Sequence, residues 1–474
     1  MKNNKIIDIN KKSYIGILIM LASLIVISII ITYIIPKGTF GTTINEFGEE
    51  VVDYSNYIKY TDKSGINILK GIFSPILILF SGDGLSIIML CIFLLVIAGT
   101  FQIMSDNKGM NVIVGSIVNK FKDKKKIVIC LICLIFMAFG SFFGLFEEVL
   151  TLLPLVVMLT ISLGYDSYLG FLICIVATGF GFASGITNPF TVIVASNIIS
   201  ANPIANIWYR VLIFVIMYAL LLCFVFHHMR KLSKNIELSP TYKTDNLKRE
   251  NEINISAIEN KKKILISYVI FLSVIFISII TITSIKAIRD YTVVFLIAIF
   301  LIGGFLTGII VSRNSKETLK SFSRGIFAAF PTIILVLMAS SIKYILEEGM
   351  VIATIASSIS NLISGKSPFV VVFILYLIVL VLEFFISSST AKAIFVMGIL
   401  SFINVNISNE LLVLVYLFGD GYTNVLFPTS PVLLIGLSMI GMNYFSWIKN
   451  SKWLFVINTI LIIGLLLLAV LIKY

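Results

Sequence analysis

Long apolar runs separated by short polar loops dominate this sequence. A helix that crosses a bilayer needs roughly 20 mainly apolar residues, and the chain supplies about eleven such stretches. Regular spans are predicted near 14–35, 85–104, 208–226, 264–284, 291–312, 325–346 and 453–472. The pattern therefore predicts an all-α polytopic membrane protein.

Two further regions, 127–203 and 368–440, interrupt their apolar runs with Gly, Pro, Ser, Thr and Asn. Because an unbroken helix satisfies its own backbone in lipid, such residues indicate backbone that lines a cavity. In both regions an apolar run reaches a polar tip, turns back, and is followed by a span broken at a Thr-Asn pair. We therefore predict two inverted repeats, each with a re-entrant helical hairpin and a discontinuous transmembrane helix.

The repeats divide the chain into three parts. Residues 1–226 are predicted to form the first transmembrane repeat, with an external loop at 36–71 that forms a structured cap. Residues 227–263, which lack a sustained apolar face, are predicted to be a cytoplasmic linker. Residues 264–474 form the second transmembrane repeat.

Basic residues test this topology because they concentrate in cytoplasmic loops. In the arrangement with a cytoplasmic N-terminus, 25 of the 36 Lys and Arg residues lie in the inside loops and 8 lie outside. We therefore predict a bacterial inner-membrane protein. The same count results if either hairpin is a full pair of spans, so the count leaves re-entrance open.

Composition narrows the function classes. The chain is 58% hydrophobic and 13% charged, so nearly all of it is membrane domain and no separate soluble catalytic domain fits. Its net charge of +12 belongs to the flanking loops, which argues against a nucleic-acid partner. Its two histidines are adjacent and no phosphate-binding loop of ATP-driven transport is present, so a membrane-embedded enzyme and a primary pump are disfavoured.

The polar tips carry the candidate chemistry. A carboxylate within an apolar span is costly and usually faces a cavity or a partner, which makes Glu147 and Glu148 the strongest candidates. Either could bind a substrate ammonium or carry a coupled proton, and either could instead cap the returning half-helix. Glu383 and Lys392 flank the second tip and are expected to neutralise each other, with direct substrate contact as the alternative. Asp420 is either a site residue or a turn residue.

Half-helices that start at the breaks direct free N–H groups toward the bilayer midplane, where they favour a substrate carboxylate. Freed carbonyls and side-chain oxygens suit sodium, expected near Asn188 or Asn424, so sodium and a proton are both candidate coupling ions. No cofactor or catalytic residue is expected. The residues predicted to bind substrate are Glu147, Glu148, Thr187, Asn188, Ser387, Ser388, Ser389, Thr390, Asp420, Thr423 and Asn424.

Several motifs together resemble the YfcC/DcuC-type carriers of the ion transporter superfamily. They are Tyr33-Ile-Ile-Pro36-Lys-Gly38, Gly144-Leu-Phe-Glu147-Glu148, Gly164-Tyr-Asp166, Asn188-Pro189-Phe190, Ser387-Ser-Ser-Thr390 and Phe418-Gly-Asp420-Gly-Tyr-Thr-Asn424 with Pro428-Thr-Ser430. This resemblance covers nearly the whole chain. It implies a scaffold and a moving transport domain that carries the two hairpins, elevator-type motion and a homodimer.

Members of that family are associated with exchange of basic amino acids, such as arginine for ornithine, and others with four-carbon dicarboxylates. A dicarboxylate site requires uncompensated Arg or Lys. The predicted site instead contains Glu147, Glu148 and Asp420, with Lys392 as the nearby cation. We therefore expect a basic amino acid antiporter, with a C4-dicarboxylate or other organic-anion carrier coupled to sodium or protons as the alternative.

Overall fold

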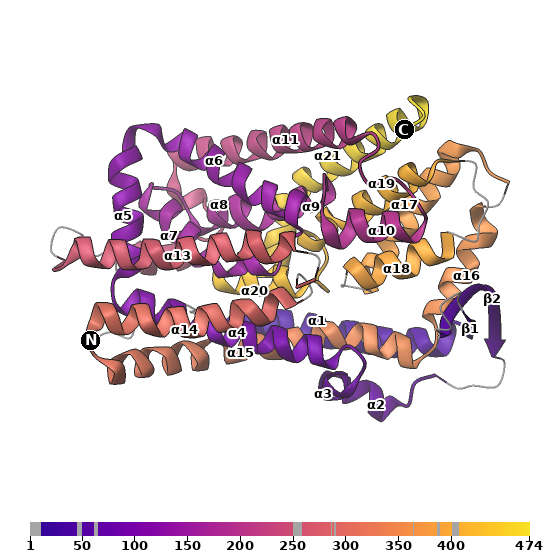
Figure 1. Cartoon of the computed structure of the whole chain (residues 1–474), viewed down its shortest axis with the longest axis horizontal. Coiled ribbons are helices and arrows are strands. Elements are labelled where there is room, and N and C mark those ends of the chain that lie inside the picture. The colour runs from indigo at the N-terminus through magenta and orange to yellow at the C-terminus, as the bar shows by residue number, and fades with distance from the viewer. Residues whose placement is uncertain are drawn as a thin grey trace.

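The computed structural model of the chain describes residues 11–44, 50–60, 65–249, 258–285, 287–288, 291–363, 365–385, 389–400 and 407–474. Most of these residues are helical, and the long helices run roughly along the longest axis of the molecule (Figure 1). Eight helices in the described part of the chain are long and apolar enough to cross a membrane. The structure is therefore that of a multi-pass membrane protein.

The predicted regular spans are confirmed as helices. They are covered by α1 (Lys11–Ile34), α4 (Gly84–Asp106), α11 (Ile207–Lys234), α13 (Lys261–Ser284), α14 (Thr292–Ser312), α15 (Ser315–Glu348) and α21 (Tyr444–Leu471). Helix α15 continues through Pro331, whose carbonyl accepts a hydrogen bond from the Tyr14 hydroxyl of α1 at 3.0 Å. Helix α5 (Gly109–Phe121) connects the end of α4 to the first irregular region.

The first irregular region contains a hairpin followed by a broken helix. The hairpin comprises α6 (Lys125–Ala138), a π-helical turn (Phe139–Phe143), a 3-10 turn (Glu148–Thr151) and α7 (Leu153–Ser162). The broken helix comprises α8 (Ser167–Phe171), a π-helical segment (Leu172–Val176), α9 (Ala177–Ala183), a second π-helical turn (Pro189–Ile193) and α10 (Val194–Ile198). Residues 184–188 separate its two halves, where the sequence predicts the break.

The second irregular region repeats this order of elements. It contains α17 (Pro368–Phe385), α18 (Ser389–Leu400), α19 (Asn409–Asp420), a 3-10 turn (Tyr422–Val425) and α20 (Pro431–Met439), and α16 (Ile352–Ile363) precedes it. With 10 residues in α7 and 9 in α20, each is about 15 Å long or less, half the thickness of the hydrocarbon core.

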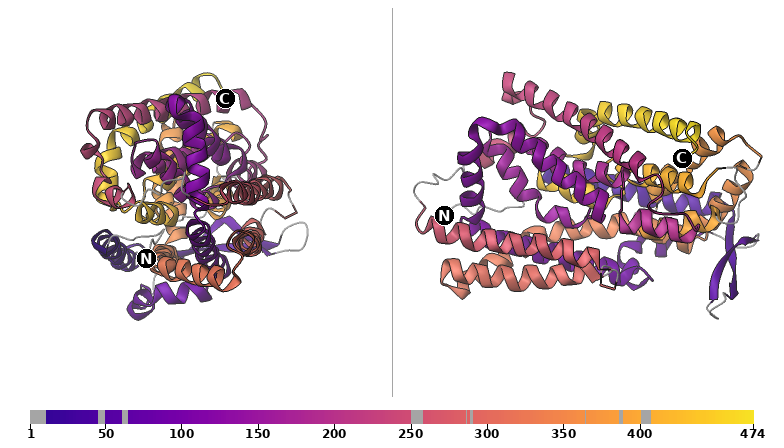
Figure 2. Two further views of the ribbon diagram at one scale, coloured as in Figure 1. Left: turned by 90° about the vertical axis from the view of Figure 1, so that its left-hand side faces the viewer. Right: turned by 45° about the horizontal axis from the view of Figure 1, so that its top comes forward.

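The two hairpins lie toward opposite ends of the molecule. In Figure 1, α6 and α7 lie toward the end that carries α5, and α17 and α18 lie toward the end that carries the two strands. In both views of Figure 2, one from the end of the molecule and one tilted from Figure 1, the helices form one bundle. This arrangement is what inverted repeats require, and the symmetry relation itself stays a prediction.

The predicted structured cap at 36–71 is a β-hairpin followed by two short helices. Strands β1 (Lys37–Ile44) and β2 (Glu50–Tyr60) pair antiparallel with a bulge at Phe40/Gly41, and α2 (Ile68–Ile72) and α3 (Ser74–Leu77) follow. The Gly38 N–H donates to the Met350 carbonyl at 2.9 Å, which ties the hairpin to the start of α16. Tyr57 reinforces this contact with a hydroxyl bond of 2.8 Å to Thr354.

The predicted linker docks onto the first repeat. Helix α11 continues into it as far as Lys234, and α12 (Tyr242–Arg249) brings Asp245 into a buried position. Asp245 accepts hydrogen bonds from the backbone N–H of Ser167 at 2.9 Å and from Thr241 at 2.6 Å. The described part of this segment is therefore fixed to the start of α8.

A second buried carboxylate completes this docking. Asp166 caps α8 by accepting the Leu169 N–H at 2.8 Å. Its other oxygen lies 2.9 Å from His228 Nε2 and accepts the Ser239 hydroxyl at 2.7 Å. Asp166, which belongs to one of the motifs shared with the carrier family, thus joins α8, α11 and the segment around Ser239. It lies away from the breaks.

Candidate functional site

The first hairpin tip packs directly on the first broken helix. A Cβ at Gly140 would lie 2.9 Å from the backbone nitrogen of Phe182, so the two helices approach at backbone distance. Ser141 bridges the break, since its hydroxyl donates to the Ser184 carbonyl at 2.9 Å and accepts the Ile186 N–H at 3.1 Å. The tip then turns at Gly144, whose φ of +69° lies in the region that favours glycine.

Asn188 organises the start of the second half-helix. Its side-chain oxygen accepts the N–H groups of Phe190 and Thr191 at 2.9 and 3.3 Å, and its amide donates to the Gly140 carbonyl at 3.1 Å. Its neighbour Thr187 is exposed and donates to the backbone of the tip. Asn188 thus caps the second half-helix and also holds the hairpin tip. Asn188 and Thr187 both donate hydrogen bonds to backbone carbonyls of this tip.

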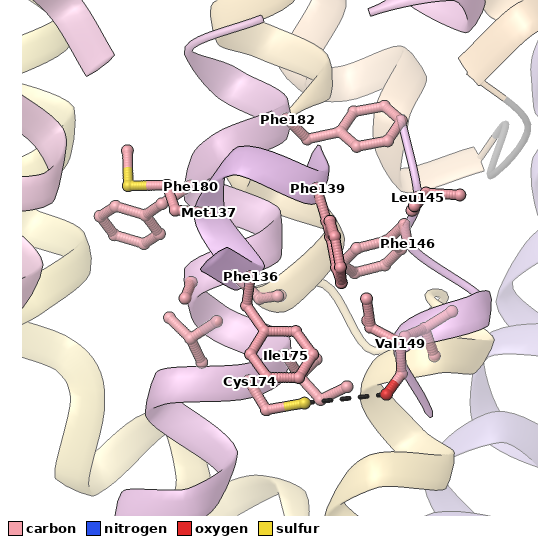
Figure 3. Close-up of a cluster of buried hydrophobic side chains, with 14 of the residues drawn as sticks. Phe136, Met137, Phe139, Leu145, Phe146, Val149, Cys174, Ile175, Phe180 and Phe182 are labelled. Atoms are coloured by element: carbon pink, nitrogen blue, oxygen red, sulfur yellow. Dashed lines mark hydrogen bonds between the residues drawn. The ribbon is translucent and has the colours of Figure 1, made fainter. Parts of the chain in front are cut away.

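Glu147 and Glu148 lie at the end of this tip, among aromatic side chains. Phe146, beside them, contacts Phe182 with ring centroids 6.0 Å apart, and Figure 3 shows these rings with Phe139 and Val149 around the tip. Glu148 is buried, and Glu147 is partly exposed. Neither carboxylate forms an ion pair with a cation in the described part of the chain, so the tip carries acidic groups that lack a protein counter-ion.

Side chains satisfy the backbone that the second break releases. The Thr423 hydroxyl donates to the carbonyls of Gly419 and Asp420, and the Asn424 amide donates to those of Asp420 and Gly421. Further along, Trp447 donates its indole N–H to the Val425 carbonyl at 3.0 Å. The Thr-Asn pair therefore acts on the turn that follows α19.

The two breaks meet. A Cβ at Gly421 would lie 2.5 Å from the Cβ of Ala183 and closer still to that residue's backbone, so the end of α9 contacts the turn after α19. A Cβ at Gly179 would lie 2.8 Å from Val425. Interrupted helices from regions more than 200 residues apart therefore converge at one place, as expected for a site between two repeats.

A buried ionic triad lies beside the second break. Lys392 of α18 forms an ion pair with Glu383 of α17, which confirms the predicted pair, and a second ion pair of 2.6 Å with Asp420 at the end of α19. The exposed fractions of the three side chains are 0%, 3% and 0% in the same order. The Tyr416 hydroxyl, one helical turn before Asp420, donates to the Ser389 carbonyl at the start of α18.

The remaining residues of the predicted site are only partly placed. Ser387 and Ser388 lie outside the described residues, as does the side chain of Thr390. Neither Tyr416 nor the contact between Lys392 and Asp420 was predicted from the sequence. For Tyr416, the sequence feature that could have indicated a role is its four-residue spacing from Asp420, which places both residues on one face of a helix.

The described residues contain eight candidate spans, two irregular regions and broken helices that converge, which are the features of a multi-pass membrane transporter. Residues 14–472 match the family described as C4-dicarboxylate anaerobic carrier. The chain belongs to this family.

Two curated proteins are similar to this chain over about four fifths of its length. The Escherichia coli protein named "Putative basic amino acid antiporter YfcC" is 24% identical over 400 residues, which cover 81% of this chain and 78% of that protein. An uncharacterized Haemophilus influenzae protein is 22% identical over 386 residues, which cover 80% of this chain and 74% of that protein.

Two solved structures of transporters also align with nearly the whole chain. The Alcanivorax borkumensis YdaH transporter is 13% identical with a TM-score of 0.42, and the alignment covers 97% of this chain and 98% of that one. Neisseria gonorrhoeae MtrF, from a class of antimetabolite efflux pumps, is 14% identical with a TM-score of 0.42, covering 95% and 94%. Similarity at this level assigns no residue of the present chain.

Proposed function

We propose that this protein is a secondary active transporter of small amino-acid-type solutes, working as an antiporter for basic amino acids such as arginine and ornithine. The observation that supports a cationic substrate is the charge at the tips and breaks. Four carboxylates, those of Glu147, Glu148, Glu383 and Asp420, accompany the single ammonium of Lys392 in the described part of these elements. A substrate with an additional positive charge would compensate this excess.

The two charged ends of an amino acid fit different parts of the proposed site. Its ammonium and its cationic side chain would contact Glu147 and Glu148, which lack a counter-ion among the described residues. Its carboxylate would lie at the start of a half-helix, such as the one capped by Ser430, where N–H groups point out of the helix. The site residues proposed from the sequence stay part of this proposal, with Asn188, Thr423 and Asn424 supporting the backbone.

Alternating access is the proposed mechanism. In this proposal the two hairpins and the two broken helices form a moving transport domain, in a homodimer within the bacterial inner membrane. The convergence of Gly421 and Ala183 supports movement of both breaks as one unit, because a backbone contact this close resists shear.

A C4-dicarboxylate or another organic anion is the second candidate substrate. The description of the matched family favours it. Such a substrate would require the proposed acidic tip to be protonated, because the only cation paired at the described breaks, Lys392, already contacts two carboxylates. The two candidates therefore predict opposite effects of removing charge from the tip.

Counterflow in proteoliposomes tests the proposal. Vesicles loaded with unlabelled arginine or ornithine should take up labelled arginine, and Glu147→Gln or Glu148→Gln should reduce the rate by at least tenfold, because a buried charge pair with the substrate is lost. Glu317→Gln, at an exposed carboxylate in the first turn of α15, is the matched control and should leave exchange unchanged.

Two other outcomes would change the assignment. Uptake of labelled succinate or malate that no amino acid inhibits would select the dicarboxylate carrier. Full arginine exchange by both glutamine variants would remove Glu147 and Glu148 from the site while leaving the transporter class intact.

A further inference from the structure

The triad of Glu383, Lys392 and Asp420 holds one more acidic group than basic groups. With all three side chains ionised its net charge is −1, and all three are at least 97% buried. Burying an uncompensated charge is strongly unfavourable, so such a cluster acquires either a cation or a proton.

The described residues around the triad supply no second cation. Among the described residues outside the triad, the titratable side chain that interacts with it is Tyr416 of α19. The Tyr416 hydroxyl donates to the Ser389 carbonyl and also interacts with the Asp420 carboxylate, so the described partners of Asp420 are this phenol and the Lys392 ammonium. No described side chain therefore supplies the missing positive charge, which a proton from solution would provide.

We propose that Glu383, Lys392 and Asp420 form a proton-binding site that takes up and releases one proton in each transport cycle. The proton would reside on one of the two carboxyl groups, leaving the other paired with the Lys392 ammonium, so the occupied site is neutral. No other bond forms or breaks. This proposal rests on the proposed secondary transport for its coupling, whereas the binding of the proton does not depend on the substrate.

A proton fits this site better than sodium does. Sodium requires several oxygen ligands, and the backbone oxygens nearest to Asp420 are already used, since the carbonyls of residues 419–421 accept hydrogen bonds from Thr423 and Asn424. The position between the two carboxylates is filled by the Lys392 ammonium. A proton needs only one carboxylate oxygen and no additional room.

The position of the triad explains how the proton would affect transport. Lys392 connects the arms of the second hairpin, α17 and α18, to the end of α19. Protonation of Asp420 would leave Lys392 paired with Glu383 alone and remove the ionic contact between the hairpin and the broken helix. Proton binding would thereby weaken the attachment of the second hairpin, α17 and α18, to the end of α19. The turn that follows α19 contacts Ala183 of the first irregular region.

Infrared difference spectroscopy of the purified full-length protein tests proton binding without any substrate. Wild type at neutral pH should show the carbonyl stretch of a buried protonated carboxyl group, and this band should persist in Glu147→Gln and Glu148→Gln, which remove the carboxyl groups of the first tip. Asp420→Asn and Glu383→Gln should each abolish this band, because the remaining carboxylate and Lys392 form a neutral pair. Lys392→Gln should roughly double it, because two buried carboxylates then lack a cation.

The same measurement can overturn the proposal. Glu317→Gln, at an exposed carboxylate, is the matched control and should leave the buried band unchanged. The proposal is wrong if wild type lacks the band, or if the band persists in both Asp420→Asn and Glu383→Gln. Loss of the band on adding sodium chloride but not choline chloride would identify a sodium site in its place.

Coupling requires a second measurement. In proteoliposomes with an imposed pH gradient, wild type should accumulate labelled arginine to an extent that depends on the gradient. Glu383→Gln, at a triad residue outside the residues proposed to bind substrate, should retain exchange but lose this dependence. If accumulation of arginine by wild type is the same with and without the pH gradient, the proposed coupling to protons is wrong. If arginine is not transported but the infrared band behaves as expected, the proposed substrate fails and the proton site stands.

Discussion

The close contact between the two breaks predicts that any side chain larger than hydrogen at Gly421 destabilises the protein. The backbone of Gly421 has φ −68° and ψ −73°, which any residue can adopt, so glycine is needed here for space alone. An alanine Cβ would lie 2.5 Å from the Ala183 Cβ, whereas carbon atoms in contact normally lie about 3.5–4.0 Å apart. Gly421→Ala therefore forces α9 and the turn after α19 to separate by about 1 Å or more.

The free-energy cost of Gly421→Ala can be estimated from the atoms that the new methyl group would meet. Overpacking a core typically costs about 1–3 kcal/mol. The obstruction at Gly421 includes backbone atoms of Ala183, which cannot rotate away as a flexible side chain can. We therefore expect a loss near 3 kcal/mol, which is about two orders of magnitude in the equilibrium between the packed and separated arrangements.

Thermal unfolding of the purified protein measures this loss, as a shift of the apparent midpoint at a fixed scan rate. Gly464→Ala is the matched control, because Gly464 lies within α21 and a Cβ there would contact nothing within 4 Å. The control should behave like wild type, and Gly421→Ala should unfold at a lower temperature and transport more slowly. A Gly421→Ala variant with the midpoint and transport rate of the control would refute the close contact.

Two further predictions concern ionic contacts outside the breaks. Asp166→Ala should destabilise the protein by about 3 kcal/mol, since it removes a helix cap and leaves His228 and Ser239 without a buried acceptor, and limited proteolysis should then cleave 235–249 faster. Arg324→Ala should change the thermal midpoint by less than the equivalent of about 1 kcal/mol, because the 2.7 Å ion pair between Arg324 and Asp106 is partly exposed. A larger shift of the midpoint that persists in high salt would contradict this expectation.

The helical spans were predictable because each one is determined locally by its own apolar residues. The breaks were predictable for the same reason, since Gly, Pro and Asn interrupt an apolar run wherever the run is placed. The ion pair of Glu383 and Lys392 followed from their positions on the two arms of one hairpin, which places them close together whatever surrounds the hairpin.

The contacts between distant segments could not be predicted from the sequence. Asp420 meets Lys392 because α19 packs beside α18, and Asp245 meets Ser167 because a polar segment folds back over 78 residues. Local sequence does not specify such pairings. The β-hairpin was predicted only as a structured cap, although β2 contains Val51, Val52 and Tyr57, which are residue types enriched in strands.

The difference in charge between the two tips follows from these long-range contacts. Both tips carry acidic groups, but only the second has a lysine on the returning arm, and this lysine reaches the carboxylate at its own break. In our proposals this difference separates two tasks. Glu147 and Glu148, without a cation among the described residues, remain available to a cationic substrate, whereas Glu383 and Asp420 share Lys392 and need only a proton. Because Gly421 directly follows Asp420 and contacts Ala183 of the first break, a change of charge at the triad acts one residue from the interface between the two regions.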